Sequence, residues 1–80
     1  MNNPLSSTAV IYAILSINSE IALQKEYLAS SDIDPEEREN EEDILEDLEQ
    51  AFMEFLELYK QYLKADSQLP SIEELLNSEL

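Results

Sequence analysis

The chain has 80 residues and contains neither cysteine nor histidine, so disulfides and thiolate or imidazole metal sites cannot stabilise its small core. Its 19 Asp and Glu residues outnumber 4 Lys and Arg residues, and the formal net charge of −15 excludes nucleic acid and anionic membranes as direct partners. Because 44% of the residues are hydrophobic, we expect one folded all-α domain over residues 1–80, with no cofactor and no metal.

The first expected helix spans about residues 4–29, with Asn3 as its N-cap and Pro4 at its first position. Its apolar side chains recur with heptad-like spacing on one narrow stripe, which only Gln24 interrupts. The stripe consists of Val10, Ile14, Ile17, Ile21 and Leu28. Further apolar side chains in the first half of the helix point away from the stripe, namely Ile11, Tyr12 and Leu15. This half is therefore expected to be buried on several sides.

A short linker is expected at residues 30–34, and a second helix begins at Pro35. From Asp32 onward, the spacing of the acidic residues partly matches a calcium-binding loop. However, Glu37 stands where such a loop needs glycine, and Asp43 stands in place of the final glutamate. We therefore expect a linker followed by a helix start rather than a calcium site.

The second expected helix spans residues 35–65 and carries a broad apolar face. Its central stripe consists of Leu45, Leu48, Phe52, Phe55, Tyr59 and Tyr62. Flanking side chains widen this face, on one side with Ile44, Ala51 and Leu58, and on the other side with Leu56 and Leu63. Together they cover roughly 180° of the helix surface, which is more than one antiparallel neighbour can bury.

The short linker predicts that the two long helices form an antiparallel hairpin. The register implied by their stripes pairs Ile21 with Ile44, Ile17 with Leu48, Ile14 with Phe52 and Val10 with Phe55. A short third helix is expected over about residues 71–78, with a capping box from Ser71 to Glu74 just after Pro70. Its apolar edge consists of Leu69, Ile72, Leu75 and Leu76. This helix packs either on its own chain or on a second one, and the sequence leaves both arrangements open.

The sequence offers little for catalysis, because nucleophilic triads, thiol chemistry and most transition-metal sites need histidine or cysteine. Carboxylate pairs three residues apart occur on the second helix, as in Glu39 with Glu42 and Glu46 with Glu49. These pairs face outward, whereas a di-iron site in a helical bundle needs inward-facing Glu-x-x-His pairs. We therefore expect a protein that is not an enzyme.

The apolar open end of the hairpin, opposite the linker, predicts self-association, because a chain this small rarely buries enough surface alone. We expect a small acidic module for protein–protein interaction, whose hairpins form a four-helix bundle as a dimer. The residues expected to mediate self-association are Val10, Ile11, Tyr12, Leu15, Phe52, Phe55, Tyr59 and Tyr62.

An alternative function starts from the acidic side of the second helix. Neighbouring acids there lie about 6 Å apart, a spacing that could imitate a row of phosphates. An acidic inhibitor or nucleic-acid mimic would use this side to occupy the basic groove of a partner protein, although the same acids also suit an ordinary solvated helix face. The candidate residues are Glu39, Glu42, Asp43, Glu46, Glu49 and, as an apolar anchor, Met53.

The longest apolar run, residues 9–15, is far shorter than the ~20 residues that span a membrane. The first eight residues contain no basic side chain, which is atypical of a signal peptide. We therefore expect a cytoplasmic protein whose partners are a second copy of itself or a basic protein.

Overall fold

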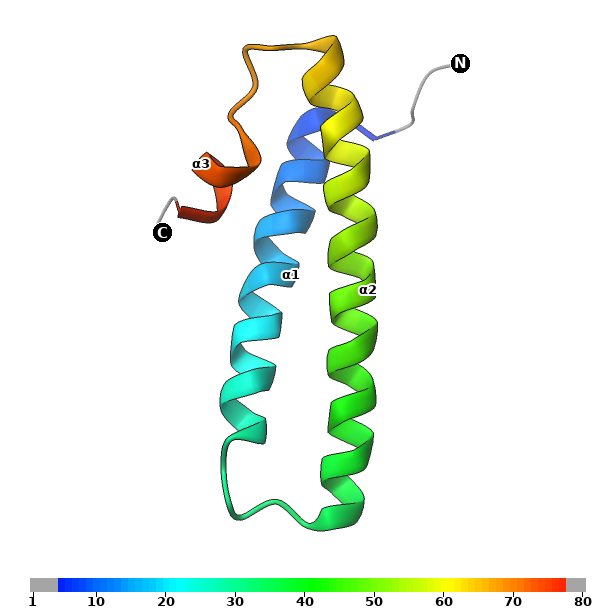
Figure 1. Cartoon of the computed structure of the whole chain (residues 1–80), viewed down its shortest axis with the longest axis vertical. Helices are drawn as coiled ribbons and strands as arrows, with labels where there is room; N and C mark the ends of the chain where they lie inside the picture. The colour runs from blue at the N-terminus through cyan, green and yellow to red at the C-terminus, as the bar shows by residue number, and fades with distance from the viewer. Residues whose placement is uncertain (1–4, 78–80) are drawn as a thin grey trace.

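The computed structural model describes residues 5–77, which form a long helical hairpin and a short third helix (Figure 1). Helix α1 spans Ser7–Leu28, α2 spans Pro35–Ala65 and α3 spans Ile72–Asn77. α1 and α2 run side by side in opposite directions, and α3 returns beside the first half of α1 (Figure 1). Within the described residues there is no strand, so the predicted all-α hairpin is confirmed.

The predicted start of the first helix at Pro4 is wrong, because α1 begins at Ser7. Ser6 has an extended backbone and is the N-cap, and its Oγ accepts a hydrogen bond of 3.1 Å from the backbone N–H of Ala9. This bond satisfies one of the N–H groups that a helix start leaves without a partner. The predicted N-cap, Asn3, lies outside the described residues.

Polar contacts fix the register of the hairpin near the linker. The amide Nε2 of Gln24 donates to the Glu41 carbonyl oxygen at 2.9 Å and to the Glu41 Oε1 at 2.6 Å. Gln24 and Glu41 each lie three residues nearer the linker than the predicted pair of Ile21 and Ile44. The observed register therefore agrees with the one predicted from the apolar stripes.

Arg38 closes the linker by binding the end of the preceding helix. Its guanidinium donates to the carbonyl oxygen of Leu28 at 2.6 Å and to that of Ser30 at 2.8 Å. The last carbonyl groups of a helix lack partners inside the helix, and a cation there also suits the helix dipole. Nearby, the Tyr27 hydroxyl donates to the Glu37 carboxylate at 2.7 Å. The linker end is thus joined by hydrogen bonds between α1 and α2.

The main hydrophobic core lies at the open end of the hairpin and includes all three helices. Its fully buried members are Val10 and Ile14 of α1 and Tyr59 of α2, with Leu75 of α3 packed against them. The predicted capping box of α3 is present, since Ser71 and Glu74 exchange hydrogen bonds of 2.8 and 3.1 Å. α3 therefore packs on its own chain.

The molecule is elongated and flattened. Its Cα atoms span 46 × 29 × 14 Å. The long dimension matches α2, whose 31 residues extend about 46 Å at 1.5 Å per residue. The short dimension exceeds the Cα diameter of a single helix, about 4.6 Å, so the three helices do not lie in one plane. α3 packs on α1 at the open end, and within the described residues no further helix covers the rest of the hairpin.

Candidate interaction surfaces

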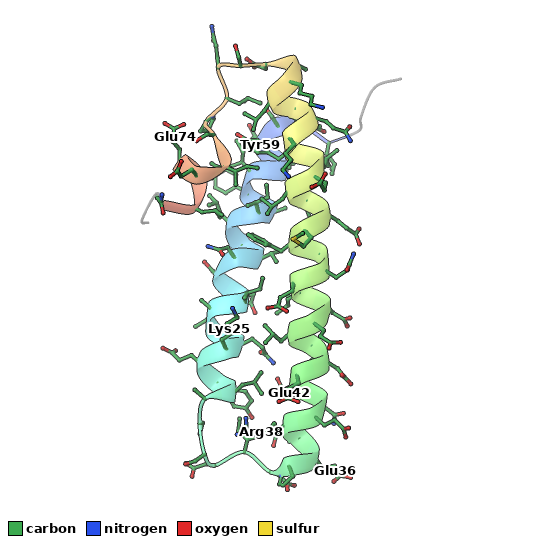
Figure 2. All side chains as sticks on the ribbon, in the orientation of Figure 1. Lys25, Glu36, Arg38, Glu42, Tyr59 and Glu74 are labelled. Atoms are coloured by element: carbon green, nitrogen blue, oxygen red, sulfur yellow. The ribbon has the colours of Figure 1, made fainter. Side chains whose placement is uncertain are left out.

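The residues predicted to mediate self-association are distributed between the core and the surface. Val10 and Tyr59 are 0% exposed, and Tyr59 points from α2 towards the segment that leads into α3, where its hydroxyl donates to the Pro70 carbonyl at 2.5 Å (Figure 2). Tyr12 is 65% exposed on α1. The remaining predicted residues are partly buried against the core, namely Ile11, Leu15, Phe52, Phe55 and Tyr62. The open end thus retains partly exposed apolar side chains around a core that α3 completes.

A second apolar row lies along one side of α2 and overlaps the row that packs on α1, because the register sets Ile44, Leu48 and Phe55 opposite residues of α1. We call it the second seam, and it consists of Ile44, Leu48, Ala51, Phe55, Leu58 and Tyr62. Its members alternate by four and three residues, the spacing with which one helix packs along another. Ile44 is 45% exposed, and Ala51 and Leu58 are partly exposed. The sequence predicted that these three residues lie on the flank of α2. Their exposure to solvent, in contrast, depends on which side of the hairpin α3 packs against.

The chain before α1 borders the second seam at the open end of the hairpin. The Tyr62 hydroxyl donates to the Leu5 carbonyl oxygen at 2.5 Å. A shallow hollow of about 200 Å³ lies among Leu5, Glu54, Phe55 and Leu58. The hollow is mostly apolar in its lining, so the second seam continues towards Leu5.

The acidic ridge of α2, formed by Glu39, Glu42, Asp43, Glu46 and Glu49, is exposed along its whole length. Within residues 5–77, none of these five carboxylates takes part in a hydrogen bond or an ion pair through its side chain. The ion pair that does occur in this range joins Lys60 to Glu57 at 3.0 Å, outside the ridge. No other side chain among the described residues therefore neutralises the negative charge of the ridge, and its use by an inhibitor or mimic stays a prediction.

A groove between α1 and α2 lies on the linker side of α3 and has a volume of about 320 Å³. We call it the interhelical groove, and its lining consists of Asn18, Ile21, Lys25, Glu49, Phe52 and Met53. Met53 is 56% exposed, and Glu49 belongs to the acidic ridge. Lys25 lies on the α1 wall of the groove, and Glu42 continues the acidic wall of α2 towards the linker (Figure 2). In this groove, apolar side chains lie next to one end of the acidic ridge. In the sequence, this arrangement was indicated by Met53, an apolar residue among the acids of the second helix.

Two tyrosines have raised pKa values for different reasons. The hydrogen bond that Tyr27 donates to Glu37 raises the pKa of Tyr27 above its usual 10.0, and partial desolvation adds to this. Burial raises the pKa of Tyr59, and the negative charges of Glu74 and Asp66 act in the same direction. Both phenols therefore remain protonated at neutral pH and serve as hydrogen-bond donors.

The described part of the chain contains no group of three or more acidic side chains arranged to hold a metal ion. None of the helices in residues 5–77 is long and apolar enough to cross a membrane. The cytoplasmic location expected from the sequence stays a prediction. Compared with protein-family models, curated proteins and solved structures, the chain matches none of them.

Proposed function

We propose that this protein is a non-enzymatic helical interaction module that self-associates, with two hairpins forming a four-helix bundle through the second seam. The observation that supports this most directly is that the side chains of the second seam have the regular spacing of a helix interface and are nevertheless partly exposed. Ile44 is 45% exposed although it continues the regular row of Ala51 and Leu58. A helix with two adjacent apolar rows is typical of bundles in which each helix has two neighbours.

The exposed area of the chain also fits a missing partner. A compact monomer of this mass is expected to expose about 4,900 Å². The chain exposes 5948 Å², roughly 1,000 Å² more than the compact monomer, and its elongated shape contributes to this excess. A specific interface of standard size buries about 800 Å² on each partner. A second copy packed on one broad side would therefore bring the exposed area close to that of a compact protein.

Charge favours an antiparallel arrangement of the two copies. The acids of α2 gather towards the linker end, whereas Lys60 and Lys64 lie near the open end. A parallel dimer would bring two acidic linker ends together, and an antiparallel dimer separates them by the length of the hairpin. The two-fold axis would then pass near the middle of the second seam, so that the same surface is used by both copies.

The proposal is tested by Ile44→Ser, with Met53→Ser as the matched control. Both positions lie on α2 and both side chains are about half exposed, at 45% and 56%. Only Ile44 belongs to the second seam. In a symmetric dimer Ile44→Ser removes two buried apolar contacts, so the dimer dissociation constant should rise at least about tenfold. Analytical ultracentrifugation over a concentration series measures this constant.

The dimer dissociation constant of Met53→Ser should equal that of the unchanged protein. Circular dichroism of both variants at high concentration checks that the helices are intact. A stable monomer at high micromolar concentration would contradict self-association. An equal loss of dimer in both variants would contradict the assignment of the second seam.

A further inference from the structure

We propose that the interhelical groove binds a cationic amphipathic helix from a partner protein. The helix would lie along α1 and α2 on the linker side of α3, with its apolar side in the groove. Its Lys or Arg residues would face the acidic ridge. This surface is separate from the second seam, so the inference goes beyond self-association.

The groove has the shape and the lining for an apolar helix side. Ile21 is almost fully buried at its base, Phe52 is partly buried, and Met53 stands exposed at its rim. A methionine adapts its shape readily, which suits a side chain that contacts a partner. Groove-bound helices are typically held by a few apolar anchors at helical spacing, so a site of this kind can hold one or two such anchors.

The length of uncovered hairpin suits a short helix. The core that includes Leu75 of α3 extends along α1 to Ile14 and Leu15, and the groove begins at Asn18, about one turn beyond Ile14. From there to Leu28, the end of α1, the hairpin extends about 15 Å at 1.5 Å per residue. A partner helix of about three turns would fill this length. It would continue the layer that α3 begins on the same hairpin.

Charge decides which occupant fits. Glu42, Glu46 and Glu49 are exposed along the α2 wall and have no partner within the described residues. A second copy of this chain has only 4 Lys and Arg residues to place against the acidic ridge, so it fits this groove less well than a cationic helix. A cationic helix gains charge-assisted contacts on the ridge while its apolar side is buried.

Lys25 adds a direction to this binding. It lies on the α1 wall, opposite Glu49 on the α2 wall. The partner helix should therefore direct its basic residues towards α2 and present neutral or acidic residues to α1. Such an asymmetric groove selects one orientation of the helix and rejects others by like-charge contact.

The test uses synthetic peptides of about 16 residues, of which the central three turns can lie along the groove. They have leucine at helical spacing, lysine on the flank that would face α2 and glutamine on the flank that would face α1. The first peptide places its leucines on one side, and a scrambled peptide of identical composition does not. Fluorescence anisotropy at about 150 mM NaCl, where long-range attraction is screened, measures the two affinities. The amphipathic peptide should bind at least about tenfold more tightly than the scrambled one, because only it buries apolar surface in the groove.

Variants of the full chain assign the binding to the groove. Met53→Ser and Glu49→Gln should each weaken the amphipathic peptide several-fold, and Glu49→Gln should also reduce the salt dependence. Leu23→Ser, at a 58% exposed position of α1 that does not line the groove, and Glu54→Gln on α2 make changes of the same kind and should leave the affinity unchanged. Equal binding of the two peptides, no binding, or equal effects of the groove variants and their controls would each overturn the proposal.

Discussion

At the residue scale, Tyr59 connects the core of the hairpin to the segment that holds α3. Its ring is 0% exposed, while its hydroxyl donates to the Pro70 carbonyl at 2.5 Å. A buried phenol of this kind needs a partner, because an unpaired hydroxyl in an apolar site is costly. One side chain thus supplies both packing against α1 and a tether to the chain before α3.

Replacing Tyr59 by phenylalanine should change the pH dependence of stability. Because burial raises the pKa of Tyr59 in the folded chain, its stabilisation is fully present below the unfolded pKa near 10. That stabilisation is lost as the pH rises from there through the folded pKa. Between about pH 9 and pH 11, the unchanged protein should therefore lose more free energy of unfolding than Tyr59→Phe. Urea unfolding followed by circular dichroism measures the free energy of unfolding of both proteins at each pH.

The control for this experiment is Tyr12→Phe, because Tyr12 is 65% exposed and lies outside the core. It should lose stability above pH 9 as the unchanged protein does. Tyr59→Phe should also cost about 1 kcal/mol at neutral pH, since it removes the hydrogen bond to Pro70. An identical alkaline loss in Tyr59→Phe and the unchanged protein would rule out this account.

At the element scale, α3 depends on the hairpin for its structure. It has 6 residues, far fewer than the roughly 12–15 that give even a marginal isolated helix in water. Its capping box satisfies two backbone groups, and Leu75 is 7% exposed in the core. The helix is therefore stabilised by its cap and by one buried anchor.

Leu75→Ala should release α3 from the hairpin. Removing a buried leucine side chain costs about 2–5 kcal/mol, which is a large part of the stability of a small domain. Hydrogen exchange followed by mass spectrometry should show lost protection in residues 72–77, with the linker end protected longest. Leu76→Ala, at a partly buried position, is the control and should have a smaller effect. Unchanged protection of α3 in Leu75→Ala would show that something other than this anchor holds it.

The elements were predictable because their signals are local, and the errors have local causes as well. Apolar stripes determined the hairpin and its register, and Ser71 with Glu74 identified the start of α3. The start of α1 was misplaced because proline at a first position is only a preference, whereas Ser6 provides an actual acceptor. Gln24 interrupts the apolar stripe of the first helix, and the sequence indicated no role for it. The predicted register already set Gln24 opposite Glu41, and in the structure the two residues are hydrogen-bonded.

At the scale of the whole molecule, a flat shape and a charge of −15 act together. Apart from Glu41, which is partly buried, every acidic side chain in the described residues is exposed to water. Within the described residues they have one ion pair, Lys60 with Glu57, and it is exposed on both sides. Pairs of this kind contribute little to stability. Mutual repulsion of the acids therefore opposes both folding and the approach of a second copy.

Added salt should stabilise the protein and strengthen the proposed dimer. Raising NaCl from about 10 to about 300 mM shortens the screening length from roughly 30 Å to below 8 Å. The melting temperature at fixed protein concentration should therefore rise, as measured by calorimetry. Glu42→Gln, Glu46→Gln and Glu49→Gln combined should raise the melting temperature at low salt and reduce its response to salt. A melting temperature that is flat or falls with salt would contradict net repulsion.

The surfaces were less predictable than the fold, because they depend on which side α3 covers. The sequence indicated an apolar face too broad for one neighbour, but it did not say which flank stays open. Val10 and Tyr59 were predicted at an interface, and the structure buries them within one chain beneath α3. The interhelical groove is likewise defined by two helices and by the point at which α3 stops. Such features depend on contacts between residues far apart in the sequence.

The Arg38 contacts have a consequence for the order of folding. They join residues ten and eight positions apart, whereas the Tyr62–Leu5 hydrogen bond joins residues 57 positions apart. Short loops lose less chain entropy on closing, so the linker end should form first and the hairpin should then zip towards the open end. If so, Arg38→Ala slows folding in stopped-flow measurements, whereas Leu75→Ala mainly speeds unfolding. The core at the open end would then be the last part of the molecule to form and the first to be lost.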